Sequence, residues 1–166
     1  MNKFIIGIII IVIGLAAGFL FFKQKQEAPR TEEDFATNML LTSPSFENNG
    51  FIPVKFTCDG STSLTAGGGD INPELHIQNV PPGAKSLALI MDDPDAPGRT
   101  FTHWLIWNIA PKTAIIKQES RPPGGIEGRT DFGRTGYGGP CPPAGKPHRY
   151  FFKLHALDVM LNLPEG

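Results

Sequence analysis

Glycine and proline recur at high density through most of the chain, and this density constrains the fold more than any other feature of the sequence. The chain of 166 residues contains 19 glycines and 16 prolines, and most of them follow residue 38. Glycine in a helix is entropically costly, and proline breaks a helix because it lacks a backbone N–H. The sequence therefore predicts short strands joined by loops, with few and short helices.

Apolar runs of strand length lie between the segments rich in glycine and proline. They span residues 51–57, 85–91, 101–110 and 148–158. In the first and last of these runs apolar and polar residues alternate, as they do in strands with one buried face. Turn-forming pairs such as Asp59-Gly60 and Pro82-Gly83 separate the runs. Several strands between long loops predict a mainly β domain, an antiparallel sandwich or barrel.

The N-terminal segment differs from the rest of the chain. From Phe4 to Phe22 it has a run of 19 residues without a charged side chain. A helix of this length reaches roughly 28 Å, close to the hydrocarbon thickness of a bilayer. A cleaved signal peptide usually has a shorter apolar region that ends at small residues, and a buried core helix is a third interpretation. We expect residues 1–22 to form an uncleaved transmembrane anchor.

Residues 23–38 are polar and too poor in apolar side chains to fold, so we expect a flexible linker to a domain at residues 39–166. Lys3 precedes the apolar run, while Lys23, Lys25 and Arg30 follow it, and this count mildly opposes export of the domain. A very short tail before an apolar span is nevertheless typical of a signal anchor. We therefore expect a single-pass membrane protein with an extracytoplasmic domain.

Charge and cysteine content narrow the class of function. With 15 Lys and Arg against 16 Asp and Glu, the formal net charge is −1, which gives no electrostatic case for nucleic acid. The two cysteines, Cys58 and Cys141, fit neither a disulfide-dense scaffold nor a four-ligand zinc site. In an exported domain they can form one disulfide. Two separate buried thiols are an equally good interpretation.

Three segments combine ionisable side chains with an unusual backbone. Residues 92–97 (DDPDAP) follow an expected strand and place carboxylates at a sheet edge, although aspartate before proline is also a common turn initiator. His103 and Trp104 point to opposite faces of a strand, and a histidine there is more often a core residue than a ligand-binding one. Residues 137–150 (YGGPCPPAGKPHRY) form a stiff loop rich in donors, which suits an anion or an arginine–aspartate pair.

Together these segments resemble the phosphatidylethanolamine-binding protein (PEBP) family, in its bacterial and archaeal Raf-kinase-inhibitor-like branch. The resemblance rests on FTCDG at 56–60, KSLALI at 85–90, DPDAP at 93–97, HW at 103–104 and GYGGPCPPAGKPHRYFFKLHALD at 136–158. It implies a PEBP-like antiparallel β-sandwich with long ordered loops and few short helices, preceded here by the transmembrane helix. It also implies a small pocket that accepts phosphate, acetate, cacodylate or a phospholipid head group.

Carried onto this chain, the resemblance implies a ligand-binding pocket lined by Asp93, Asp95, His103, Tyr137, Gly139, Cys141, His148 and Tyr150. A carboxylate beside an anion is unfavourable, so we expect Asp93 to hydrogen-bond His103 or to accept from a ligand ammonium. His103 and His148 bind an anion best when protonated, so affinity should fall as the pH rises through their pKa values. Arg149 points to the other face and is expected in a structural ion pair.

We therefore expect a non-enzymatic domain that binds phosphate or a phospholipid head group, without a metal or cofactor. Asp93, Asp95, His103 and His148 are residue types that bind divalent cations, but their positions match no catalytic metal signature. No serine lies in a G-x-S-x-G elbow, and Cys141 has no evident base beyond His148. The alternative function is inhibition of a protease or another protein partner by direct contact, as in some relatives.

The C-terminal end departs from the family pattern. Relatives usually continue past the strand at 148–158 into a helix and a last short strand. This chain ends at Gly166, where Pro164 and Glu165 are typical of a first helical turn. We expect a domain that is truncated at its C-terminus and lacks this helix.

Overall fold

The computed structural model describes residues 38–58 and 68–166. The expected anchor at residues 1–22 and all but the last residue of the expected linker lie outside the described residues. The described part forms seven strands and one short 3-10 helix, η1 (Val54–Phe56). Within that part, no helix is long and apolar enough to cross a membrane.

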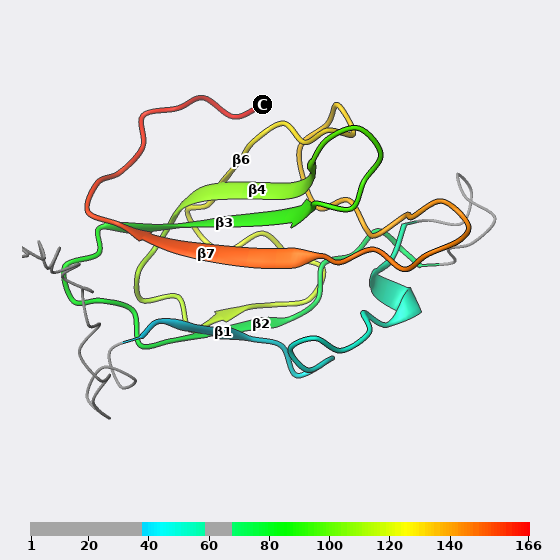
Figure 1. Cartoon of the computed structure of the whole chain (residues 1–166). Helices are drawn as coiled ribbons and strands as arrows, with labels where there is room; N and C mark the ends of the chain where they lie inside the picture. The colour runs from blue at the N-terminus through cyan, green and yellow to red at the C-terminus, as the bar shows by residue number, and fades with distance from the viewer. Residues whose placement is uncertain (1–37, 59–67) are drawn as a thin grey trace, which may run out of the picture.

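The strands form two antiparallel sheets that lie one above the other (Figure 1). The larger sheet has the order β6-β4-β3-β7, with β3 (Ser86–Asp93), β4 (Phe101–Ile109), β6 (Ile126–Glu127) and β7 (Phe151–Leu157). The smaller sheet has the order β1-β2-β5, with β1 (Leu40–Thr42), β2 (Leu75–Gln78) and β5 (Ile115–Ile116). The predicted mainly β, antiparallel class is confirmed, and three of the four expected strands correspond to β3, β4 and β7.

The core lies between the two sheets, because alternate side chains of their strands point inward. Leu87, Leu89 and Met91 of β3 are completely buried and cluster with Leu75 of the smaller sheet. Trp104 of β4 is buried in the same cluster, as strand alternation predicts. Ala88 and Ile90, which point to the outer face of β3, are half-buried, and this cover on both faces explains why residues 85–91 form a nearly continuous apolar run.

One local prediction was wrong. Residues 51–57 alternate in hydrophobicity but contain η1 instead of a strand, and within η1 only Phe56 is buried, while Phe51 ahead of it is exposed. Pro53 precedes the helix, accepts the first 3-10 hydrogen bond from Phe56 and has no N–H to donate to a sheet. At the C-terminal end, the Glu165 carboxylate pairs with Arg121 at 2.8 Å.

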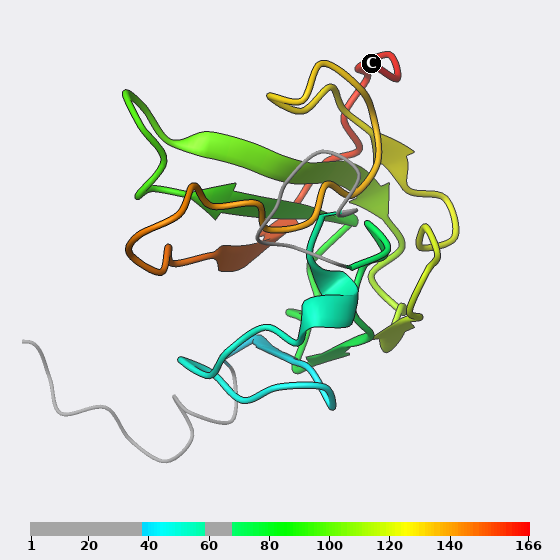
Figure 2. The same cartoon turned by 90° about the vertical axis from the view of Figure 1, so that its right-hand side faces the viewer.

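The loops that carry the predicted motifs gather at one end of the larger sheet, the right-hand end in Figure 1, which faces the viewer in Figure 2. Residues 94–100 connect β3 to β4, and residues 138–150 lead into β7. A disulfide between Cys58 and Cys141 ties the second of these loops to the segment after η1. The structure thus decides between the two interpretations of the cysteines in favour of the pair.

Candidate ligand-binding site

A pocket of about 170 Å³ lies among these loops. Five of the eight predicted site residues line it, namely Asp93, His103, Cys141, His148 and Tyr150. The rest of its wall is apolar and consists of Ala96, Pro97, Phe101, Phe132, Pro142 and Pro143. Pockets for drug-sized ligands usually measure about 300–1,000 Å³. This pocket therefore suits a ligand, or a ligand head group, of only a few heavy atoms.

Asp93 is the last residue of β3, and His148 lies in the loop that leads into β7. Their side chains form a buried pair. The Nδ1 atom of His148 lies 2.7 Å from Oδ2 of Asp93, and the two side chains are only 11% and 4% exposed. An ionised carboxylate accepts hydrogen bonds and donates none, so Nδ1 of His148 carries the proton. This leaves Nε2 of His148 for another partner.

His103 is held by the backbone of the loop across from it. Its Nδ1 atom lies 2.8 Å from the carbonyl oxygen of Gly138, which can only accept, so Nδ1 is the donor. The predicted bond from Asp93 to His103 is therefore wrong, because Nδ1 of His103 is already taken and Asp93 bonds to His148 instead. Burial lowers the pKa of the His103 imidazole, which is neutral at neutral pH.

The Tyr150 hydroxyl has no hydrogen-bond partner among the described residues. The hydroxyl is buried and lies near the Asp93 carboxylate and the backbone N–H of Cys141, without a hydrogen bond of good geometry to either. Burial, together with the negative charge of Asp93, raises the pKa of Tyr150, so the phenol keeps its proton. Buried polar groups without partners are rare in native proteins, and the Asp93 carboxylate is the acceptor that lies beside this hydroxyl.

Asp95 does not line the pocket, contrary to the prediction. Both of its carboxylate oxygens accept from Arg149, at 2.8 Å from Nε and 2.7 Å from Nη2. These hydrogen bonds hold the pKa of Asp95 well below its ordinary value. Arg149 is therefore in a structural ion pair, as expected. This pair connects the loop after β3 to the loop that leads into β7.

Tyr137 and Gly139 also lie behind the pocket and do not line it. The Tyr137 hydroxyl donates to the carbonyl oxygen of Phe56 at 2.8 Å, and the ring packs edge-on against Trp104. A Cβ atom on Gly139 would overlap the backbone of Thr57 and Cys58. Both residues thus support the loop from the side of η1, and only glycine permits this close approach.

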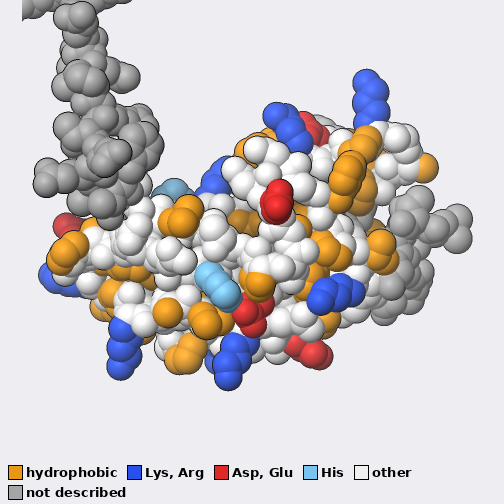
Figure 3. Space-filling view, turned by 90° about the horizontal axis from the view of Figure 1, so that it is seen from below, with side chains coloured by type: hydrophobic (Ala, Val, Ile, Leu, Met, Phe, Trp, Pro, Cys, Tyr) orange, Lys and Arg blue, Asp and Glu red, His pale blue; other side chains and the backbone are white. Residues whose placement is uncertain are grey.

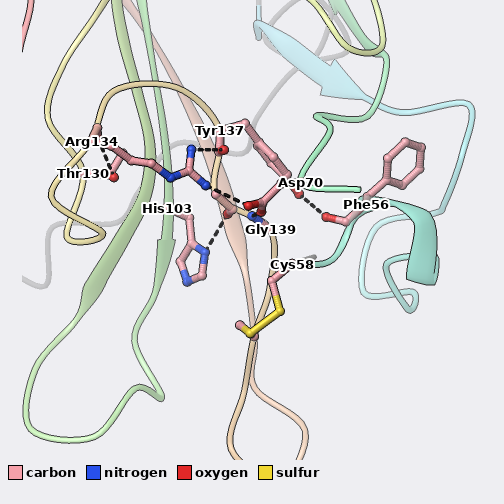
Figure 4. Close-up of polar contacts among 10 residues, drawn as sticks. Phe56, Cys58, Asp70, His103, Thr130, Arg134, Tyr137 and Gly139 are labelled. Atoms are coloured by element: carbon pink, nitrogen blue, oxygen red, sulfur yellow. Dashed lines mark hydrogen bonds and ion pairs between the residues drawn. A yellow bond between two sulfur atoms is a disulfide. The ribbon is translucent and has the colours of Figure 1, made fainter. Parts of the chain in front are cut away.

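The predicted set of site residues also omitted Phe132, Asp70 and Arg134. Phe132 lines the pocket and packs against the rings of Phe101 and His103, with centroids 4.9 and 5.2 Å apart. Asp70 and Arg134 lie behind the loop in the network drawn in Figure 4. Phe132 and Arg134 lie four and two residues before the recognised GYGGPCPP segment, which was a usable signal. Asp70, by contrast, is 64 residues from Arg134 in the chain.

A larger groove adjoins the pocket. It has a volume of about 770 Å³ and shares Pro142, His148 and Tyr150 with the pocket wall. Apolar side chains of residues 41–52 and of β7, including Phe46 and Phe152, line much of it. The surface on the side of β1 and β2 also exposes hydrophobic side chains, interspersed with charged ones (Figure 3).

The fold and the site define a β-sandwich domain with a pocket of histidine and aspartate at one end of its sheets. The sequence model described as phosphatidylethanolamine-binding protein matches residues 42–166, which is most of the chain. The chain belongs to this family, as the motifs predicted.

Relatives and solved structures agree with this assignment. The UPF0098 protein PH1269 of Pyrococcus horikoshii is 49% identical over 134 residues, which cover 76% of this chain and 64% of that protein. The UPF0098 protein YbhB of Escherichia coli is 41% identical over 136 residues, or 77% of this chain and 84% of YbhB. This chain thus spans slightly less than two thirds of the length of the first protein and more of the second.

Two crystal structures have the same fold. The structure of E. coli YbcL, described as a member of the mammalian PEBP family, matches with a TM-score of 0.70 and 32% identity, covering 76% of this chain and 82% of YbcL. The PEBP homologue CT736 of Chlamydia trachomatis matches with a TM-score of 0.68 and 36% identity, covering 78% of this chain and 82% of CT736.

Proposed function

We propose that this domain binds a small phosphate-bearing ligand, either free phosphate or a phospholipid head group, and that it carries out no chemical reaction on it. One observation supports this proposal above the others. His103 and His148 line the same small pocket, and each uses Nδ1 for a bond to the protein. Neither Nε2 atom has a hydrogen-bond partner among the described residues, so both can contact a ligand.

The chemistry of the wall suits a phosphate in two protonation states. A neutral imidazole accepts at Nε2 from a phosphate hydroxyl or a ligand ammonium, and a protonated one donates to a phosphate oxygen. The negative charge of Asp93 is offset when His148 is protonated, so it repels an anion less than an unpaired carboxylate would.

We also propose that the domain is attached to a membrane on its extracytoplasmic side. The uncharged run from Phe4 to Phe22 supports the attachment. A relative in Mycobacterium tuberculosis, LppC, is 40% identical over 132 residues, and its name describes it as a candidate lipoprotein. The Cys58–Cys141 disulfide supports export, because outside hyperthermophiles such bonds persist mainly in oxidising compartments.

Calorimetric titration of the full chain in a non-ionic detergent tests the binding proposal. Inorganic phosphate and phosphorylethanolamine should bind to the wild type, and His148→Ala should weaken both by at least about tenfold, since it removes a charge-assisted contact. His155→Ala is the matched control, because His155 is exposed on β7 outside the pocket. Equal affinities of the wild type and His148→Ala would contradict the proposed site.

The same titration separates the two sources of the phosphate group. A short-chain phosphatidylethanolamine, kept below its micelle concentration, should bind more tightly than phosphorylethanolamine if a lipid is the ligand. The reason is that its chains add apolar contact with the neighbouring groove. Equal affinity for both ligands would favour a soluble phosphate compound.

A further inference from the structure

One peptide group, between Gly138 and Gly139, lies between a pocket histidine and a carboxylate outside the pocket. Its carbonyl oxygen accepts from Nδ1 of His103 at 2.8 Å, and its N–H donates to Oδ1 of Asp70 at 2.6 Å. In a trans peptide the N–H and the C=O point in opposite directions. The bond to Asp70 therefore fixes the direction in which the Gly138 carbonyl points, which is toward His103 (Figure 4).

Arg134 holds both Asp70 and the preceding peptide. Its Nη2 atom donates to Oδ2 of Asp70 at 2.8 Å, and its Nη1 atom donates to the carbonyl oxygen of Tyr137 at 3.0 Å. The backbone carbonyl of Arg134 accepts from both the N–H and the hydroxyl of Thr130, at 2.9 and 2.8 Å. One guanidinium thus connects the loop backbone to the carboxylate that orients it.

Packing explains why this peptide needs support from outside the loop. A Cβ atom on Gly138 would overlap the Phe132 ring, and one on Gly139 would overlap the backbone of Thr57. Both positions therefore require glycine. Two consecutive glycines leave the peptide between them free to rotate, because neither has a side chain that restricts φ and ψ. The hydrogen bonds of this peptide to Asp70 and His103, together with the bond from the Gly138 N–H to the His103 carbonyl oxygen at 2.9 Å, supply the restriction that a side chain would otherwise give.

We propose that Asp70 and Arg134 are positioning residues of the ligand site, which hold the 138–139 peptide so that its carbonyl keeps the proton of His103 on Nδ1 and leaves Nε2 for the ligand. This inference rests on the proposed function, because it assigns a role in the same pocket to two residues that do not line it. The charge of Asp70 also polarises the peptide and strengthens its carbonyl as an acceptor.

A purely structural ion pair is the competing explanation. The Asp70 and Arg134 side chains are 32% and 46% exposed, and ion pairs of this kind contribute little to stability. Under that explanation, removal of either residue changes the stability of the fold slightly and leaves the imidazole of His103 as it was. The tautomer of His103 therefore distinguishes the two explanations, whereas stability alone does not.

The test uses the full chain in detergent with histidine rings labelled with ¹⁵N. Asp70 has a φ of 55°, which glycine and asparagine tolerate, so Asp70→Gly removes the carboxylate without backbone strain. We expect a single Nδ1–H tautomer of His103 in the wild type and a mixture of tautomers in Asp70→Gly. Phosphate affinity should fall about tenfold, as for other groups that orient a histidine ligand.

Two further variants complete the test. Asp70→Asn keeps an oxygen acceptor for Gly139 but not the charge, so it should preserve the Nδ1–H tautomer and lower phosphate affinity less. Arg121→Met is the control, because Arg121 forms an exposed pair with Glu165 away from the pocket, and it should change neither quantity. Arg134→Met should behave like Asp70→Gly, to a smaller extent.

The outcomes separate this inference from the proposed function. If Asp70→Gly lowers only the stability and keeps both the His103 tautomer and the phosphate affinity, the positioning role is overturned. If the wild type does not bind phosphate but Asp70→Gly still changes the tautomer, the proposed function fails and the positioning of His103 stands.

Discussion

At the scale of single residues, the properties of the pocket depend on which nitrogen of each imidazole is already bonded. A carboxylate occupies Nδ1 of His148, and a backbone carbonyl occupies Nδ1 of His103. His103 is also packed against three aromatic rings, Phe101, Phe132 and Tyr150, which keep water from one side of it. The two imidazoles of one pocket are therefore held by different kinds of group.

The burial of His103 predicts a pH dependence of stability. Its folded pKa is lowered, so as the pH falls the unfolded chain, with a His pKa of about 6.5, takes up the proton first. The free energy of unfolding should thus decrease below about pH 6.5, by at most about 1.4 kcal/mol per pH unit from this group, and level off below the folded pKa. Asp93 and Asp131, whose charges act on the ring, oppose this effect.

Urea unfolding of the wild type and His103→Gln between about pH 7.5 and 5 measures this contribution. The variant has no titrating ring at this position, so it should lose less stability over the range. The same decrease in both proteins would show that the His103 imidazole is not the group responsible.

At the scale of elements, the site is made where the ends of β3, β4 and β7 meet the long loops. The sequence predicted these three strands because each is an apolar run of strand length, and it predicted the DPDAP and GPCPP loops from their motifs. It did not predict the short strands β1, β2, β5 and β6, whose two to four residues carry too little periodicity to detect. The segment 51–57 was misassigned because its alternation does not correspond to burial.

The Cys58–Cys141 disulfide predicts a large effect on stability. It joins residues separated by 83 positions, and removing such a cross-link typically costs about 2–5 kcal/mol. Replacing both cysteines by alanine should lower the free energy of unfolding by this amount. Dithiothreitol should do the same to the wild type and have no effect on the double variant. Identical unfolding of the wild type with and without the reductant would contradict the disulfide.

At the scale of the whole molecule, the sequence located the site but not its internal connections. Five of the eight predicted residues line the pocket, whereas Asp95, Tyr137 and Gly139 support it from behind. The motif brings all eight to one end of the sandwich, and only the path of the chain decides which side chains face inward. The contribution of Asp70 depends on a contact 69 residues away in sequence, which no local pattern contains.

The most direct test of the proposed pocket uses the chain's own four histidines as reporters. The full chain in detergent, with ¹⁵N-labelled histidine rings, is titrated with inorganic phosphate to millimolar concentration. We predict that the Nε2 signals of His103 and His148 shift together with a single affinity, while those of His76 and His155, which do not line the pocket, stay unchanged. No shift of either pocket histidine in folded protein, or equal shifts of all four, would contradict a phosphate site in this pocket.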